Sequence, residues 1–266
     1  MTVYLLPPRR MLAALLAAFA ALCGGAGCAA AAEDAAPAEE VSLVYLGKTY
    51  DEPPPLSLLE KVLTDEGLAG ARLGVGDNNT TGKFLNQKFV LREAVVDAQG
   101  DVVAKAKEIF AAGPALVVAD VKADDLLAIA DLPEARDSVI FNVRSSRDEL
   151  REQDCRKNLF HIIPSFAMRA DALAQYLIWK RWNRWLLIKG VTPDDDAYAA
   201  AVRRAAGRFG GKIVEERVYA FEAGSRRTDS GHQQIQTQMP QLTQGAKEHD
   251  VIWVADVGEA FGEYLL

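Results

Sequence analysis

The strongest constraint in this 266-residue sequence is a regular alternation of short apolar runs with longer segments of helical periodicity. Asp101 can cap a helix that runs to residue 112, and the runs at 115–119 and 139–143 are short and rich in valine and isoleucine. A helical segment at 123–130 lies between these two runs. Because helices of this kind join neighbouring parallel strands, the alternation predicts parallel sheets.

The alternation extends in both directions. Before Asp101 the patterns predict a strand at 41–46, a helix at 54–67, a short strand at 71–76, a turn-rich stretch at 77–82 and a β-rich run at 89–96. Further on they predict helices at 166–182, 195–209 and near 232–246, and strands at 185–189, 212–221 and 251–255. We therefore predict an α/β fold of two Rossmann-like lobes, each with a parallel sheet.

Residues 139–180 mark the passage from one lobe to the other. One strand ends there in a polar loop, and a new strand at 159–163 leads into the next helix. We interpret the new strand as the start of the second lobe, which gives a first lobe at 41–158 and a second at 159–266. A cleft is expected between them, and in open α/β sheets ligands bind beyond the carboxyl ends of the strands.

The first 32 residues have the composition of a secretory signal. Arg9 and Arg10 precede an apolar run at 11–23 that is too short to span a bilayer, and the alanines at 30–32 resemble a cleavage site. A competing interpretation is a lipoprotein box ending at Cys28, which would then carry a lipid anchor. The sequence thus predicts an exported chain with an Ala, Pro and acid linker at 33–40.

The composition excludes one class of partner and one kind of scaffold. The chain has a net charge of −7, which argues against binding to nucleic acid, and half of its residues are hydrophobic, enough for one or two packed cores. Beyond the signal the cysteines are too few for a disulfide framework. Cys155 lies in a charged loop, so we interpret it as a partly exposed free thiol rather than a nucleophile.

The best candidate for a ligand site is the polar loop after the strand at 139–143. Arg144 can hold a carboxylate through two parallel hydrogen bonds, and the hydroxyls of Ser145 and Ser146 can bind further ligand oxygens. An anionic or polyoxygenated solute would fit this loop. The alternative is a solvated loop whose arginine forms surface ion pairs with Asp148 or Glu149.

Other suggestive features indicate structure rather than catalysis. The consecutive carboxylates at 194–196 are expected to stabilise a helix dipole, because the spaced oxygen ligands of a calcium loop are absent. The tryptophans at 179, 182 and 185 are expected in the core or at a lobe interface. The histidines are scattered and no pair of nucleophile and base is evident, so we predict no enzyme, no metal site and no cofactor.

Four motifs occur in the order found in one family of receptors. They are Pro164-Ser-Phe-x-x-Arg169, Trp185-Leu-Leu-Ile-Lys189 before Asp196-Ala-Tyr198, Phe209-Gly-Gly-Lys-Ile-Val214, and Asp250-Val-Ile-Trp-Val-Ala-Asp256. With them the chain resembles the type I periplasmic solute-binding proteins of ABC transporters, the family of the branched-chain amino-acid receptors. The segments 77–82 and 142–146 look like the subgroup associated with pyrroloquinoline quinone-dependent alcohol dehydrogenase systems.

The resemblance implies a function and further ligand contacts. It implies a periplasmic protein that closes two lobes over a small polar or anionic solute and delivers it to an ABC permease in the inner membrane. A ligand-sensing or regulatory protein of the same fold is the alternative. The family pattern places Phe166, Tyr198 and Asp256 beside the ligand, whereas the loop at 118–122 lacks the Ser and Thr groups that hold an α-amino acid. It also leads us to expect further units after Asp256, so the second lobe looks incomplete.

Overall fold

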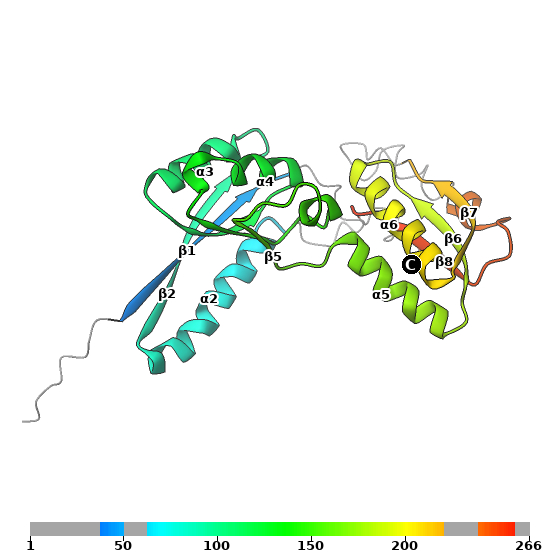
Figure 1. Cartoon of the computed structure of the whole chain (residues 1–266), viewed down its shortest axis with the longest axis horizontal. Helices are drawn as coiled ribbons and strands as arrows, with labels where there is room; N and C mark the ends of the chain where they lie inside the picture. Colours follow the sequence, from blue (N-terminus) through cyan, green and yellow to red (C-terminus); the bar gives the residue numbers. More distant parts are fainter. Residues whose placement is uncertain (1–37, 51–62, 221–238, 259–266) are drawn as a thin grey trace, which may run out of the picture. The chain divides into compact units, whose positions relative to one another are not determined.

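The structure, a computed structural model, describes residues 38–50, 63–220 and 239–258 (Figure 1). The predicted signal, Cys28 and most of the helix predicted at 54–67 lie outside these residues. In the described part, two parallel sheets with helices confirm the predicted α/β fold class. None of the described helices is long and apolar enough to cross a membrane.

The first sheet has five strands, all parallel, in the order β2-β1-β3-β4-β5. They are β1 (Glu39–Lys48), β2 (Gln87–Val96), β3 (Leu116–Asp120), β4 (Val139–Asn142) and β5 (Leu159–His161). The connections contain α2 (Glu66–Leu85), α3 (Val102–Ala111), α4 (Ala123–Ala130), and the short 3-10 helices η1 (Pro133–Ala135) and η2 (Asp148–Arg151). Parallel strands place the loops that follow them along one edge, and the candidate site lies on this edge.

The second sheet has three described strands, all parallel, in the order β7-β6-β8. They are β6 (Arg184–Lys189), β7 (Lys212–Val218) and β8 (Val251–Ala255), and α5 (Phe166–Trp179) and α6 (Pro193–Phe209) accompany them. The caps explain where these helices begin: Ser165 accepts a hydrogen bond from the Met168 amide, and Thr192 forms a capping box with Asp195.

Each sheet has its own core. The first core gathers apolar residues of β1, β3 and β4 with the inner faces of α3 and α4. In the second, the central strand β6 is apolar on both faces, with Trp185 and Leu187 packed toward α5 and α6 and Leu186 and Ile188 on the other side. Strands buried on both faces are typical of parallel sheets, which explains why the runs at 115–119 and 185–189 were easy to recognise.

The first α-helix of the described chain corrects the sequence interpretation. We expected a strand at 71–76 and a turn-rich stretch at 77–82, but both lie within α2. Asn78 donates to the Gly74 carbonyl 2.8 Å away, and the Asn79 side chain exchanges two hydrogen bonds with the Phe89 backbone. These residues usually compete with helical hydrogen bonds, but here their polar groups are satisfied by the helix itself and by the next strand.

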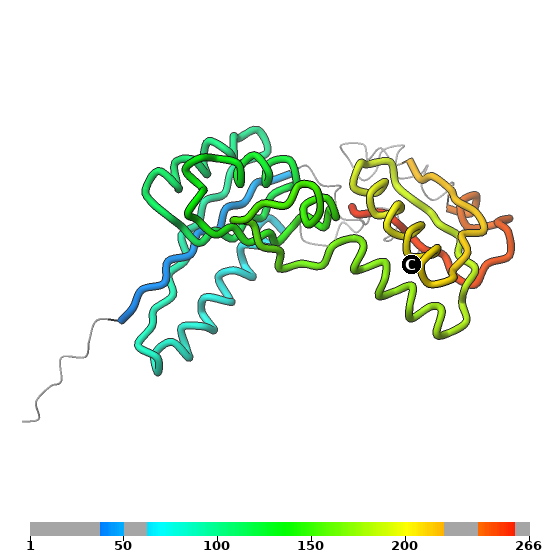
Figure 2. Tube along the Cα trace, in the orientation of Figure 1, coloured from blue at the N-terminus to red at the C-terminus, as the bar shows by residue number. Residues whose placement is uncertain are grey.

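The structure corrects two further expectations, the sheet to which β5 belongs and the burial of the tryptophans; the chain can be followed from the first sheet to the second in Figure 2. The strand predicted at 159–163 does not open the second lobe, because β5 pairs with β4 and belongs to the first sheet. The tryptophans divide: Trp185 is fully buried, whereas Trp179 is 74% exposed and Trp182 is 44% exposed. The predicted free thiol of Cys155 is confirmed, and it is exposed.

Candidate functional site

The loop after β4 is organised by the buried side chain of Asn142. Its amide oxygen accepts from the backbone N–H groups of Arg144 and Ser145, at 3.1 and 2.9 Å. Its amide nitrogen donates to the Ser145 carbonyl at 2.7 Å and lies 3.0 Å from Nδ1 of His161 on β5. All hydrogen-bonding capacity of the carboxamide is used, so the turn that presents Arg144 is fixed to the sheet.

Arg144 and Tyr45 share the carboxylate of Asp120 at the carboxyl end of β3. Asp120, the last residue of β3, accepts a hydrogen bond from the Tyr45 hydroxyl at 2.5 Å and pairs through its other oxygen with Nε of Arg144. Burial, and then the hydrogen bond to the Asp120 carboxylate, raise the pKa of the Tyr45 phenol above its usual value. Tyr45 is therefore a neutral donor at any physiological pH, and Asp120 holds the guanidinium in place.

Tyr50 forms the second part of this edge and is surrounded by cationic side chains. The charged groups of Lys48, Lys122 and Arg144 lie 5.9, 4.5 and 5.4 Å from the centre of its ring. The Tyr50 hydroxyl donates to Asp125 at 2.9 Å and accepts from the Lys122 backbone at 2.8 Å. Burial and the Asp125 carboxylate raise the pKa of Tyr50 to about 12, against the Lys122 amide, which acts to lower it.

The Arg144 side chain forms an ion pair at the edge of the first sheet. Arg144 pairs with Asp120, and Asp148 accepts a hydrogen bond from the Ala167 amide at the start of α5. Sequence reasoning missed Tyr45, Tyr50 and Asp120 as members of the site. One signal could have found Asp120 and Tyr50, since they lie at or just after the carboxyl end of a parallel strand, whereas Tyr45 lies within β1, before its last residue Lys48.

Phe166 and Tyr198, the two aromatic residues predicted to contact a ligand, lie together in the second core. Their exposed fractions are 2% and 9%, and their rings stack with centroids 5.3 Å apart. The guanidinium of the exposed residue Arg169 lies over the Tyr198 ring, 5.2 Å from its centre. The two rings therefore support a cationic side chain at the start of α5.

Asp256, the third predicted residue of the second lobe, directly follows β8 and is half-buried. The next residue, Val257, donates its N–H to Asp195 at 2.7 Å, and Asp195 also accepts from the Thr192 amide at 2.9 Å. Asp195 is 2% exposed, and a Cβ at Gly190 would collide with its carboxylate. One buried carboxylate thus joins the loops after β6 and β8.

The three consecutive carboxylates at 194–196 have three different partners. Asp194 pairs with Arg147 at 2.6 Å, Asp195 caps α6, and Asp196 pairs with Lys189. Among the described residues no group of three acidic, histidine or cysteine side chains is placed to hold a metal ion. All three carboxylates lie in the first turn of α6, and Asp195 forms the capping box with Thr192.

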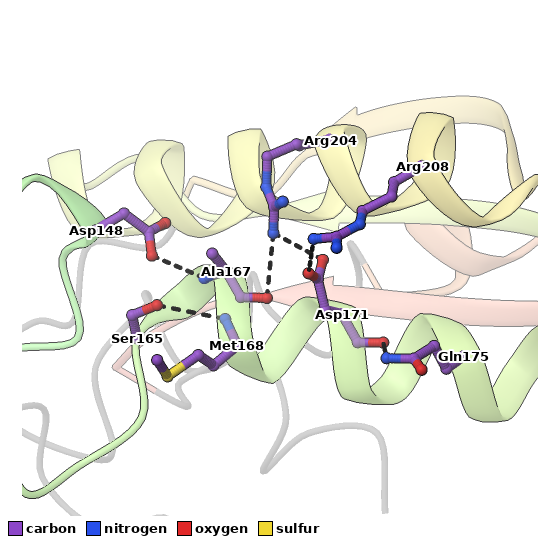
Figure 3. A network of polar contacts seen from close by, with 8 residues as sticks. All are labelled: Asp148, Ser165, Ala167, Met168, Asp171, Gln175, Arg204 and Arg208. Carbon is purple, nitrogen blue, oxygen red and sulfur yellow. Dashed lines mark hydrogen bonds and ion pairs between the residues drawn. The ribbon is translucent and has the colours of Figure 1, made fainter. Parts of the chain in front are cut away.

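Polar contacts also fix α5 beside α6 (Figure 3). Asp171 of α5 pairs with Arg204 at 2.7 Å and with Arg208 at 2.8 Å, and Arg204 also donates to the Ala167 carbonyl at 3.3 Å. Asp171 itself is largely shielded, with 18% of its side chain exposed. Two arginines on successive turns of α6 therefore hold one face of α5, the face from which Asp171 projects.

The chain belongs to the periplasmic binding protein family, whose model matches residues 62–261. No curated protein matches the chain significantly. Among solved structures, an ABC transporter substrate-binding protein from Desulfitobacterium hafniense, also described in complex with Leu, is similar with a TM-score of 0.56 and 20% identity. A branched-chain amino acid ABC transporter periplasmic ligand-binding protein from Burkholderia xenovorans is similar with a TM-score of 0.56 and 18% identity.

These similarities show which fold the chain has and how much of each related protein it covers. The match covers 82% of this chain and 58% of the Desulfitobacterium protein, and 79% of this chain and 60% of the Burkholderia protein. The chain therefore spans about 60% of the length of these relatives. At such identities the similarity to the solved structures shows a shared fold.

Proposed function

We propose that this protein is a periplasmic receptor that binds a small anionic solute for an ABC permease of the inner membrane. The observation that carries the proposal is the gathering of Lys48, Lys122 and Arg144 around the Tyr50 ring at the carboxyl edge of the first sheet. Membership of the periplasmic binding protein family supports the role of a solute receptor.

Lys122 is the cation best placed to meet an incoming anion. Among the described residues the Lys48 ammonium pairs with Asp125 and the Arg144 guanidinium pairs with Asp120. Lys122 is exposed, and its ammonium lies over the Tyr50 ring. A carboxylate that approached the turn of Ser145 and Ser146 could pair with Lys122 beside the Arg144 guanidinium.

The second lobe contributes Arg169 and Asp256 in this proposal. Phe166 and Tyr198 act through Arg169, because their rings are buried and the guanidinium lies over one of them. The loop after β3 reads Asp120-Val121-Lys122 without the Ser and Thr groups of an amino-acid receptor, so we favour an acid without an α-amino group. The resemblance to proteins of pyrroloquinoline quinone-dependent alcohol oxidation makes short organic acids, the products of such oxidation, the first compounds to test.

The test is a thermal-shift screen of the purified chain against short organic acids, amino acids and alcohols. A solute that binds only the folded state raises the unfolding temperature, and the shift grows with the logarithm of the ratio of its concentration to its dissociation constant. We expect an acid to give the largest shift. Lys122→Ala and Arg144→Ala should each reduce the affinity for that acid at least about tenfold, the loss of one charge-assisted contact.

The matched control is Arg72→Ala in the same lobe. Arg72 pairs with Glu93 through two hydrogen bonds of 2.7 Å, so this variant also removes an arginine and carboxylate pair, but one on the surface. It should leave the acid-induced shift unchanged. Equal losses in Arg72→Ala and Arg144→Ala, or a screen in which only amino acids or alcohols bind, would contradict the proposal.

A further inference from the structure

We propose that the outward face of α5 and the turn after it bind the surface of a bilayer rich in anionic phospholipid. This aromatic face consists of Met168, Ala172, Tyr176, Trp179 and Trp182. The inference goes beyond solute binding and rests on residues that the candidate ligand site does not use.

The aromatic face is apolar, exposed and continuous along the helix. Met168, Ala172, Tyr176 and Trp179 follow one another at spacings of four, four and three residues, which places them on one side of an α-helix. Their exposed fractions are 55% for Met168, 49% for Tyr176 and 74% for Trp179. Trp182, in the turn that follows, is 44% exposed. Soluble proteins rarely leave such a row of large apolar side chains in water without a partner.

The opposite face of α5 is already occupied, so the aromatic face cannot turn inward. Ala170, Ala174 and Leu177 are buried in the second core, and Asp171 is held by Arg204 and Arg208 of α6 (Figure 3). Figure 3 shows Met168 extending from the side of α5 away from these two arginines. The direction of the aromatic face is therefore set by the packing of α5 against α6.

The charge around the aromatic face is opposite to that of the whole chain. Residues 172–183 contain the two basic residues Lys180 and Arg181 and no acidic one, whereas the chain as a whole carries −7. The Lys180 ammonium lies 4.6 Å from the centre of the Trp179 ring and 5.6 Å from that of Tyr176, and Arg181 is exposed beside it. A basic and aromatic patch in an acidic protein complements a negatively charged surface.

The backbone conformation of Arg181 is a second, independent observation in favour of a binding role for this patch. It has φ of +65°, and the bonds from Arg181 N–H to the Ile178 carbonyl and from Trp182 N–H to the Leu177 carbonyl form a Schellman motif. Glycine is the usual residue at this left-handed position because any Cβ there is strained. The arginine is thus held in an unfavourable backbone conformation at the helix end, next to Trp179 and Trp182, and the fold alone does not require its side chain.

Tryptophan and tyrosine with neighbouring lysine and arginine are the residues that favour the boundary between lipid headgroups and acyl chains. The rings enter the apolar boundary while the ammonium and guanidinium groups meet lipid phosphates. A second copy of this chain would bring Lys180 and Arg181 of one patch against the same cations of the other in a two-fold arrangement. The chemistry therefore favours an anionic lipid surface as the partner.

The experiment uses the whole chain and a local readout, because the apolar run at 11–23 could attach the chain to vesicles by itself. The four tryptophans are Trp179, Trp182, Trp185 and Trp253, of which the last two are 0% and 3% exposed. Brominated phosphatidylglycerol quenches a tryptophan only in direct contact, so quenching reports on the aromatic face. We expect quenching by vesicles of brominated phosphatidylglycerol, much less by brominated phosphatidylcholine, and a decrease in high salt.

Charge variants test whether the patch itself causes the quenching. Lys180→Glu with Arg181→Glu keeps both reporter tryptophans and should weaken the lipid contact reported by quenching at least about tenfold, because each basic residue near an anionic surface contributes to binding. The matched control is Lys105→Glu with Lys107→Glu on α3, which changes the net charge equally. An equal loss in this control would show a general charge effect and overturn the proposal.

Arg181→Gly separates a role in binding from a role in folding. Glycine accepts the left-handed conformation, so this variant should unfold at a higher temperature than the parent chain while binding phosphatidylglycerol vesicles several-fold more weakly. Unchanged vesicle binding in this variant would contradict the proposal. A concentration-dependent dimer in sedimentation that Trp179→Ala dissociates and that vesicles do not disrupt would also contradict it.

Solute-induced thermal shifts should be the same in all these variants, so failure of the lipid proposal is distinct from failure of the proposed receptor function.

Discussion

The two sheets hold the loops at their carboxyl edges with different buried groups. In the first sheet the group is the carboxamide of Asn142, which is 0% exposed, and in the second it is the carboxylate of Asp195, which is 2% exposed. Asn142 faces two N–H donors, a carbonyl and an imidazole nitrogen, whereas Asp195 faces backbone N–H donors. The comparison teaches that the donors and acceptors around a buried position select the residue type there.

The largest expected effect is at Asp195. Asp195→Ala leaves the Thr192 and Val257 amides without their carboxylate acceptor, and we expect the free energy of unfolding to fall by about 3 kcal/mol. Asp195→Asn should lose nearly as much, because its NH2 group would face an N–H donor. Urea unfolding followed by circular dichroism measures both losses.

The control for Asp195 is its neighbour Asp196, whose side chain is 58% exposed and pairs with Lys189. Asp196→Asn should change the free energy of unfolding by less than about 1 kcal/mol, as for other surface ion pairs. Similar losses at the two positions would show that the buried carboxylate has no special structural role.

The reverse substitution, Asn142→Asp, should lower the free energy of unfolding by an amount that depends on pH. In Asn142→Asp at pH 8 a carboxylate would face the Ser145 carbonyl and Nδ1 of His161, and we expect a loss of about 2 kcal/mol. Near pH 5.5 a protonated His161 could donate to the new carboxylate. The pKa of His161 in this variant would be raised above its unfolded value, so the recovered stability is present at low pH and is lost as the pH rises through the raised pKa.

Asn158→Asp is the matched control for this pH dependence. Asn158 is also a buried amide, and it donates to the Ala130 and Ala135 carbonyls at 3.0 and 3.2 Å, without a histidine among these partners. It should lose stability at pH 8 and regain less of it at pH 5.5 than Asn142→Asp, because only protonation of the new carboxyl group itself can relieve the loss. Equal recovery in both variants would exclude His161 as the cause. The measurement is the urea midpoint at each pH.

The smallest expected effect is the pH dependence of the parent chain near His161. Burial, and then the positive charge of Arg151, lower the pKa of His161, whose Nε2 lies 3.2 Å from the Leu150 carbonyl. The unfolded chain therefore binds the proton more tightly than the folded chain. Stability is fully present above the unfolded pKa of about 6.5 and falls as the pH decreases toward the lower folded pKa.

His161→Gln should flatten this decrease in urea midpoints measured from pH 7.5 to pH 5. His249→Gln is the control, because the His249 ring contacts the Lys247 carbonyl and no strand of the first sheet. If the slope persists in His161→Gln, the neutral imidazole beside Asn142 is not what stabilises the loop after β4 at neutral pH.

Local patterns predicted much of the fold and part of the site. The helix capped by Asp101, the helix α4 and the strand β8 appear where residue spacing placed them. Asp101 is a clear cap, α4 buries apolar residues at helical spacing, and β8 is a short apolar run rich in valine. The helix α2 was missed because Gly, Asn and Thr in its second half are typical of turns. Only the contact of Asn79 with the Phe89 backbone shows why that segment is helical.

The sequence by itself determined the parallel α/β class, the position of Arg144 after a buried strand, and the run of aromatic and basic residues at 179–182. All of these follow from local spacing and composition. The tertiary structure alone decided that β5 joins the first sheet, that Asp120 unites Tyr45 with Arg144, and that α5 turns Trp179 outward. These depend on contacts between residues far apart in the chain, and local periodicity carries no information about which distant strand, carboxylate or helix will be the partner.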